Sequence, residues 1–175
     1  MENPELGITR VKNIYAQKGY RKDWVDIRLH GMVVSSSLTD EWSERGAQKP
    51  TDRETLTNDI MEGAFDLKVD NYKKLKGLED ENLRDHMTDM ELVLTMVAEV
   101  TTKALTEKNN SQGMSQLRED AKMGGAVAGK TRKAIEMAVG RSVISKENFL
   151  TSNSTTSDAI ASTGNSVSKR KKPKY

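Results

Sequence analysis

The sequence predicts an all-α protein, with a single multi-helix domain over residues 7–150 and a disordered tail over residues 151–175. Apolar residues recur at every third or fourth position through most of the chain, and no segment alternates as a half-buried strand would. A length of 175 residues suits one compact domain. Residues 151–168 are mostly Ser, Thr, Asn and Gly, so they bury too little apolar surface to offset the entropy lost on ordering.

Composition limits the kinds of site that the chain can form. The hydrophobic fraction is 35% and only 5% is aromatic, so the core is built mainly from Leu, Ile, Val, Met and Ala. The absence of cysteine excludes disulfides, thiolate metal sites and a cysteine nucleophile. No apolar run reaches the roughly 18–20 residues of a membrane span. Residues 1–10 lack the apolar core of a signal sequence, so we expect a cytoplasmic protein without a membrane partner.

Apolar periodicity and closing glycines predict the first two helices. A short apolar face consists of Ile8, Val11, Ile14 and Tyr15, and Gly19 follows it. A long helix is expected over residues 23–45, with Gly46 just past its C-terminus. Its repeating residues are Trp24, Ile27, Gly31, Val34, Leu38 and Trp42. The run Val-Val-Ser-Ser-Ser has weak helix propensity, so we expect burial of the two tryptophans to stabilise this helix.

Two capping boxes predict where further helices begin. Thr51 and Glu54 form the first box after Pro50 and open a helix. Its predicted inner face consists of Leu56, Ile60 and either Ala64 or Phe65. A short helix over residues 69–76 then ends at Gly77. Thr88 and Glu91 form the second box, and its helix extends to about Glu107. The predicted inner face of that helix consists of Met90, Leu94, Val97, Thr101 and Leu105.

The stretch MGGAVAGKT at residues 123–131 matches the phosphate-loop pattern G-x-x-x-x-G-K-[ST]. A phosphate loop follows a buried strand, whereas residues 116–123 form a charged helical segment. A stripe that passes through the glycines predicts a last helix beginning near Ser115: Leu117, Ala121, Gly124 or Gly125, Ala128, Arg132, Ile135 and Val139. We interpret Gly124, Gly125 and Ala128 as a tight helix crossing, with Lys130 on the outer face. A nucleotide hydrolase is kept as a third hypothesis because of the literal motif.

Lysine-rich segments are the candidate nucleic-acid contacts. Residues 56–75 resemble a loose helix-turn-helix whose second helix carries Lys73, Lys74 and Lys76. The alternative is two packed helices with a lysine-coated exposed face. The basic tail can contact phosphates without reading base sequence, or can act as a solubilising end. Its charged residues are Lys169, Arg170, Lys171, Lys172 and Lys174.

Nothing in the sequence points to catalysis, a metal or a cofactor. His30 and His86 are the only histidines, and their separation is not that of a metal-ligand pair. No nucleophile-elbow sequence surrounds a serine. The sequence therefore predicts a non-enzymatic protein without a small-molecule substrate.

Several segments in order resemble one family. They are LTDEWSERG (38–46), LTNDI (56–60), YKKLKGL (72–78), ENLRDHMT (81–88) with EL (91–92), GGAVAG (124–129) and VISKENF (143–149). Together they are similar to the helical region of DNA-damage-inducible protein D and of BRO-type prophage antirepressor-like proteins, over about residues 8–150. In that family an amino-terminal BRO-like module associated with DNA binding usually precedes this region. We expect that module to be absent here, unless it lies in another chain or was removed. The resemblance implies a phage- or plasmid-type regulator, or a modulator of the DNA-damage response that acts on the recombinase filament.

The first hypothesis is an interaction protein that binds a protein partner, or itself, through an amphipathic helical face. The partner would be recombination or repressor machinery. The helix containing Trp24 and Trp42 and the final helix are the expected surfaces. The alternative is a DNA-binding transcriptional regulator that uses residues 69–76 and the basic tail.

Overall fold

The computed structural model describes residues 4–148, which fold as an all-helical single domain and contain no strand. The predicted fold class is confirmed, whereas the predicted disordered tail over residues 151–175 lies outside the described residues. The elements are α1 (Pro4–Gln17), α2 (Lys22–Glu44), α3 (Pro50–Phe65), α4 (Val69–Leu75), the 3-10 helix η1 (Leu83–His86), α5 (Asp89–Asn109) and α6 (Gly113–Val139).

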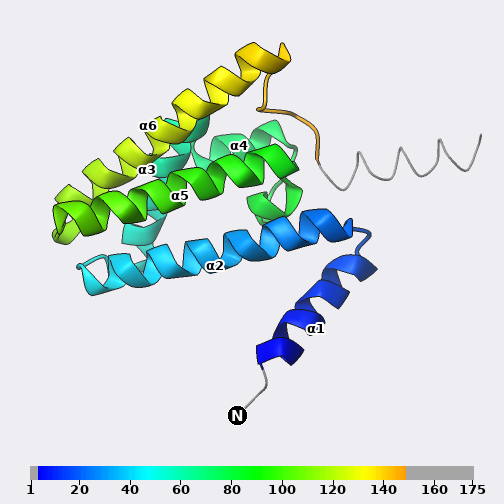
Figure 1. Cartoon of the computed structure of the whole chain (residues 1–175), viewed down its shortest axis with the longest axis horizontal. Coiled ribbons are helices and arrows are strands. Elements are labelled where there is room, and N and C mark those ends of the chain that lie inside the picture. The colour runs from blue at the N-terminus through cyan, green and yellow to red at the C-terminus, as the bar shows by residue number, and fades with distance from the viewer. Residues whose placement is uncertain (1–3, 149–175) are drawn as a thin grey trace, which may run out of the picture.

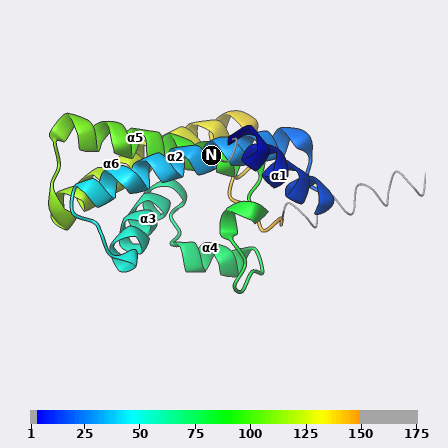
Figure 2. The same cartoon turned by 90° about the horizontal axis from the view of Figure 1, so that it is seen from below.

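Helix α5 lies at the centre of the arrangement. It runs between α6 and α2 on the face that Figure 1 presents, and α3 and α4 lie together on the opposite side, as Figure 2 shows. The most extensive helix contacts join α6 to α3 and α5, and α5 to α2. Helix α1 projects from this body and packs on α2 (Figure 1).

The tryptophans of α2 are both buried, which confirms the expected basis of this long helix. Trp24 is fully buried and its indole Nε1 donates a hydrogen bond to the Met87 carbonyl at 2.9 Å. Trp42 and Leu38 are each 2% exposed. The chain leaves α2 through Gly46, whose φ of +110° lies in the region that favours glycine.

One predicted capping box is correct and the other is wrong. Thr88 Oγ1 accepts the Glu91 amide at 3.4 Å, and the Glu91 carboxylate accepts the Thr88 amide at 2.7 Å, as predicted. Helix α3, however, begins at Pro50, so Asp52 occupies the third position that was assigned to Glu54. The Asp52 carboxylate accepts the Lys49 amide at 3.0 Å. Proline fits the first turn because its missing N–H leaves no unsatisfied donor there.

The predicted inner face of α5 is largely wrong. Only Leu94 of the five predicted residues is fully buried, and Met90 is 42% exposed. The buried residues are Glu91, Leu92, Leu94, Thr95, Ala98, Glu99, Thr102 and Thr106. Threonines enter the interior because Thr95 and Thr102 donate their hydroxyls to carbonyls four residues earlier, each at 2.8 Å. A pattern that equates apolar with buried therefore misplaces this helix.

Candidate functional site

The MGGAVAGKT segment lies in the middle of α6, where it forms a helix crossing. A Cβ atom at Gly124 would lie 2.8 Å from the Thr102 amide nitrogen and 2.9 Å from the Ala98 carbonyl oxygen of α5, and would also overlap Thr102 Oγ1. Ala128, one turn further along, is fully buried. Helices α5 and α6 therefore approach so closely that no side chain fits at Gly124.

A second crossing on the neighbouring side of α6 brings it against α3. A Cβ atom at Gly125 would lie 2.5 Å from the Ile60 carbonyl oxygen, and one at Gly129 would overlap the Gly63 carbonyl oxygen. Gly63 itself lies within α3, and a Cβ there would lie 2.9 Å from Gly125 Cα. The glycines thus fix α6 against two helices at once.

This geometry is incompatible with a phosphate loop. Residues 123–131 are helical throughout, so their amides face carbonyls of the preceding turn rather than a ligand. Lys130 is exposed, and the Thr131 hydroxyl donates to the Val127 carbonyl at 3.0 Å. The literal motif match therefore carries no argument for a nucleotide site.

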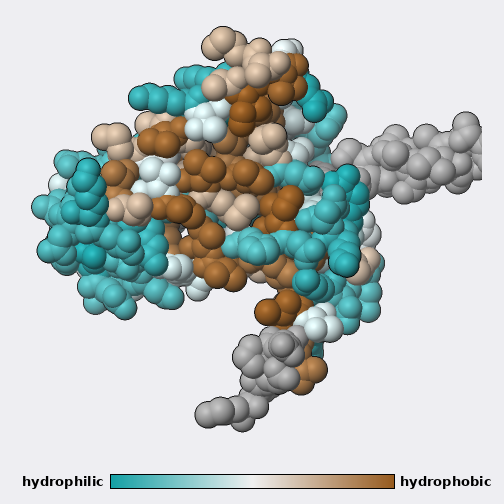
Figure 3. Space-filling view, in the orientation of Figure 1, coloured by the Kyte–Doolittle hydropathy of each residue, from teal (hydrophilic) through white to brown (hydrophobic). Residues whose placement is uncertain are grey.

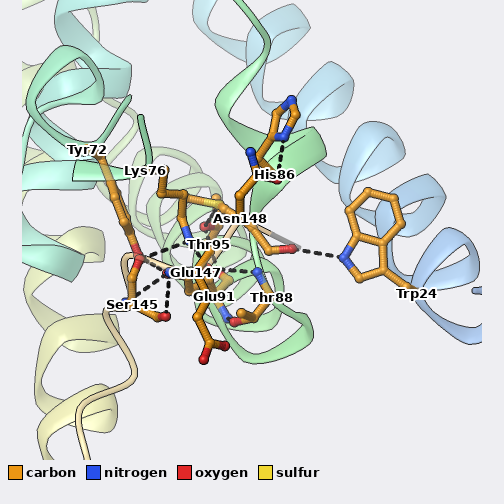
Figure 4. A network of polar contacts seen from close by, with 11 residues as sticks. Trp24, Tyr72, Lys76, His86, Thr88, Glu91, Thr95, Ser145, Glu147 and Asn148 are labelled. Carbon is orange, nitrogen blue, oxygen red and sulfur yellow. Dashed lines mark hydrogen bonds and ion pairs between the residues drawn. The ribbon is translucent and has the colours of Figure 1, made fainter. Parts of the chain in front are cut away.

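A buried polar cluster surrounds Glu91, at the start of α5 (Figure 4). Its carboxylate accepts hydrogen bonds from the Tyr72 hydroxyl and, at 2.7 Å, from the Thr88 amide. Lys76 Nζ lies 2.9 Å away, and the side chains of Lys76 and Glu91 are both completely buried. Burial, followed by the Glu91 charge and hydrogen bond, raises the pKa of the Tyr72 hydroxyl, which therefore remains a donor.

Lys76 uses all three of its ammonium protons inside the fold. Besides Glu91, it donates to the Ser145 carbonyl at 3.1 Å and to the Glu147 carbonyl at 2.8 Å. Nearby, His86 Nδ1 lies 2.8 Å from the Asn148 side-chain oxygen. The cluster therefore holds residues 145–148 against α4 and η1 (Figure 4).

The position of Lys76 in this cluster corrects the prediction that all three lysines of α4 and its C-terminus contact DNA. Lys76 is buried and paired, so it cannot reach a phosphate. Lys73 is half-buried and Lys74 is exposed, on a helix of only seven residues. Lys169, Arg170, Lys171, Lys172 and Lys174 lie outside the described residues. The described part of the predicted interface retains only two of its three lysines.

A second polar cluster, around Asp85, joins α1 and α2 to η1. Asp85 Oδ1 accepts from Arg28 Nε and from the Tyr15 hydroxyl, each at 2.9 Å. Tyr20 donates its hydroxyl to the Asp85 carbonyl at 2.6 Å and stacks on Trp24, with ring centroids 4.4 Å apart. Burial, together with the hydrogen bond to Asp85, raises the pKa of Tyr15 to about 12.

Alkaline pH should destabilise this cluster before Tyr15 ionises in the folded protein. The folded-state pKa of Tyr15, about 12, lies above the ordinary tyrosine value of about 10, so folding favours the protonated hydroxyl. The stabilisation that the protonated Tyr15 hydroxyl gives the folded state is complete below about pH 10 and is lost as the pH rises towards 12. Urea unfolding midpoints measured across this range should fall, and less steeply in Tyr15→Phe than in the native protein. Equal slopes would contradict the assignment.

The exposed side of α5 carries an apolar stripe. Its residues repeat at intervals of three and four: Met90, Val93, Val97, Val100 and Ala104. Val100 is 54% exposed and Val93 is 39% exposed. Helix α6 adds Met123 and Val127, which are 57% and 39% exposed. Figure 3 shows apolar residues gathered over this side of the molecule, and we refer to these seven residues as the α5–α6 face.

The flanks of the α5–α6 face differ in charge. Helix α2 has five acidic and two basic residues, a net charge of −3. Helix α6 has five basic and three acidic residues, a net charge of +2. The two helices on either side of α5 therefore differ in the sign of their net charge.

The residues that the sequence assigned to helix packing or interaction pack inside the fold and are not on this face. Trp24, Trp42, Gly124, Gly125 and Ala128 are all buried between helices. The valines of α5 were missed because Val97 was assigned to the core together with Leu94. The sequence did contain a pattern that could have identified them. Residues 89–109 have a second apolar stripe, which runs through Val93, Val97, Val100 and Ala104.

No metal cluster and no candidate membrane helix occurs in the described part of the chain. No group of three or more His, Asp or Glu residues there could hold a metal ion. No helix there is long and apolar enough to cross a membrane. No family model, curated protein or solved structure matches the chain.

Proposed function

We propose that the protein is a non-enzymatic regulator that acts by binding a protein partner through the α5–α6 face. The observation that carries this proposal is the inverted pattern of α5. This helix buries Glu91, Glu99 and three threonines while it leaves Val93 and Val100 in solvent. Buried charged residues and exposed contiguous valines are both uncommon, and the second is typical of an interaction surface.

The free energy gained by covering apolar surface favours a protein occupant of the α5–α6 face. Covering apolar surface yields roughly 25 cal/mol for each Å² removed from water. The α5–α6 face offers seven apolar side chains on two helices whose separation is fixed by the Gly124 crossing. A rigid face loses little conformational entropy on binding, so more of this gain remains as affinity.

The biological setting comes from the family resemblance. The order of segments from LTDEWSERG to VISKENF is similar to DNA-damage-inducible protein D and the BRO-type antirepressor-like proteins. The proposed role is therefore in prophage regulation or the bacterial DNA-damage response, with recombination or repressor machinery as partner. The recombinase filament is the first partner to test.

Binding to filaments of a bacterial recombinase on single-stranded DNA tests this proposal directly. Fluorescence anisotropy of the labelled protein should show binding that weakens about tenfold or more in Val93→Asp/Val100→Asp, as expected for truncating a buried apolar anchor of an interface. Val33→Asp is the matched control, because Val33 is 71% exposed on α2 and lies outside the face. It should bind as the native protein does.

Three outcomes would count against parts of the proposal. An equal loss of filament binding in Val33→Asp and in Val93→Asp/Val100→Asp would contradict the role of the α5–α6 face. In a second outcome, the native protein fails to bind the filament but self-associates as its concentration rises. If the double variant abolished that self-association, the occupant of the face would be a second copy of this chain. Binding to the bare single strand that the double variant retains would favour the DNA-binding alternative.

A further inference from the structure

A polar pocket lies between α2 and the residues that lead into η1, apart from the α5–α6 face. It is an open depression of about 430 Å³ with walls from Arg28, Ser35, Ser36, Asp40, Asn82 and Arg84, and Met32 forms an apolar side. That volume is within the range of small-molecule sites, roughly 300–1,000 Å³. Its walls come from segments more than 40 residues apart in the chain, so the fold and not the local sequence assembles it.

Arg28 supplies a fixed cation on the pocket wall. The residue is 5% exposed, and Nε donates to Asp85 Oδ1 at 2.9 Å. The Arg28 guanidinium also lies within hydrogen-bonding reach of the Tyr15 hydroxyl, and Arg28 lines the pocket. A guanidinium held by one nitrogen on a carboxylate leaves its outer edge available to a second oxyanion.

Arg84 adds a second cation of the same kind. Its Nη2 donates to Glu99 Oε1 at 2.5 Å, and Glu99 is buried. The Arg84 amide donates to Asn82 Oδ1 at 3.0 Å, which leaves the Asn82 amide group as a further donor. The hydroxyls of Ser35 and Ser36 add further donors to the pocket wall. Donors therefore outnumber acceptors in this pocket, where Asp40 is the single carboxylate.

We propose that this pocket binds a small phosphate ester. Two guanidinium edges, an amide and two hydroxyls present hydrogen-bond donors from several directions, which suits a tetrahedral oxyanion with three free oxygens. Asp85 and Glu99 each hold one guanidinium in place, so the site is organised before the ligand arrives. The cavity exceeds the size of a phosphate ion, and Met32 offers an apolar contact to the organic part of the ester. Asp40 is an exposed carboxylate in the lining and disfavours a ligand with a second anionic group.

A matched pair of variants at Ser36 tests the proposal without disturbing the arginine pairs. Ser36 is exposed and lines the pocket. Ser36→Asp places a carboxylate beside the two guanidinium groups, whereas Ser36→Asn has nearly the same shape without the charge. Thermal unfolding is followed with inorganic phosphate, with ribose 5-phosphate and with a short single-stranded oligonucleotide, at constant ionic strength.

Binding to the folded state raises the melting temperature by mass action. We expect ribose 5-phosphate and, more weakly, inorganic phosphate to stabilise the native protein and Ser36→Asn. The dissociation constant for each of these two ligands should rise tenfold or more in Ser36→Asp. Equal stabilisation of Ser36→Asp and Ser36→Asn, or none of any protein, would overturn the proposal. So would stabilisation by the oligonucleotide alone, which would assign the pocket to a nucleic-acid backbone.

Discussion

Replacing Gly124 with alanine is expected to lower the free energy of unfolding by about 3 kcal/mol or more. The added Cβ would lie 2.8 Å from the Thr102 amide nitrogen and 2.9 Å from the Ala98 carbonyl oxygen. Both are backbone atoms of a central helix, so they cannot turn aside as a flexible side chain would. Helix α6 must shift away from α5, and the contacts along the crossing loosen. Urea denaturation followed by circular dichroism measures the change.

Gly7→Ala is the control for this substitution. Gly7 lies in α1, and a Cβ atom there meets nothing within 4 Å. Alanine should therefore stabilise that helix by roughly 0.5–1 kcal/mol through its higher propensity. Lys130→Ala, at the exposed lysine of the phosphate-loop match, should change stability by less than about 0.5 kcal/mol. A Gly124→Ala protein as stable as the native one would show that α5 and α6 do not cross as described.

Lys76→Met should cost about 3–5 kcal/mol, because it leaves the Glu91 carboxylate buried without its cation. The two side chains are fully buried and 2.9 Å apart. Methionine fills a similar volume but cannot donate to Glu91 or to the carbonyls of Ser145 and Glu147. We also expect faster hydrogen exchange at the Ser145 amide, which lies 3.4 Å from Glu91 Oε1.

The double variant Lys76→Met/Glu91→Gln separates the charge effect from packing. Removing both charges avoids an unpaired buried ion, so the double variant should be more stable than Lys76→Met alone. The double-mutant cycle requires the unfolding free energies of four proteins. They are the native protein, Lys76→Met, Glu91→Gln and the double variant. Strictly additive losses would show that the two groups do not interact, contrary to the structure.

Local signals were sufficient for most helix boundaries. The predicted helix over residues 23–45 matches Lys22–Glu44, and Gly46 follows it with a positive φ. The box at Thr88 and Glu91 opens α5 as predicted. These features depend on bonds between residues a few positions apart, so the sequence contains the necessary information. The box at Thr51 failed because a proline at the preceding position competes for the first turn.

Burial was predicted less well because it depends on which helices are neighbours. Met90 and Val97 have the spacing of a core stripe, yet α5 turns a face with Ala98 and Thr102 towards α6. Lys76 has the character of a surface lysine, and only the approach of Glu91 and of residues 145–147 makes its burial tolerable. Neither placement follows from the residues of one segment.

The sequence alone determined the all-helical class, the positions of most helix ends and the crossing of helices at Gly124, since these depend on periodicity, capping and side-chain size. The tertiary structure decided which face of α5 is exposed, that Lys76 is internal, and that Arg28 and Arg84 line one pocket. Those outcomes require contacts between residues far apart in the chain. Their free energies come from desolvation and pairing, which exist only once the helices have packed.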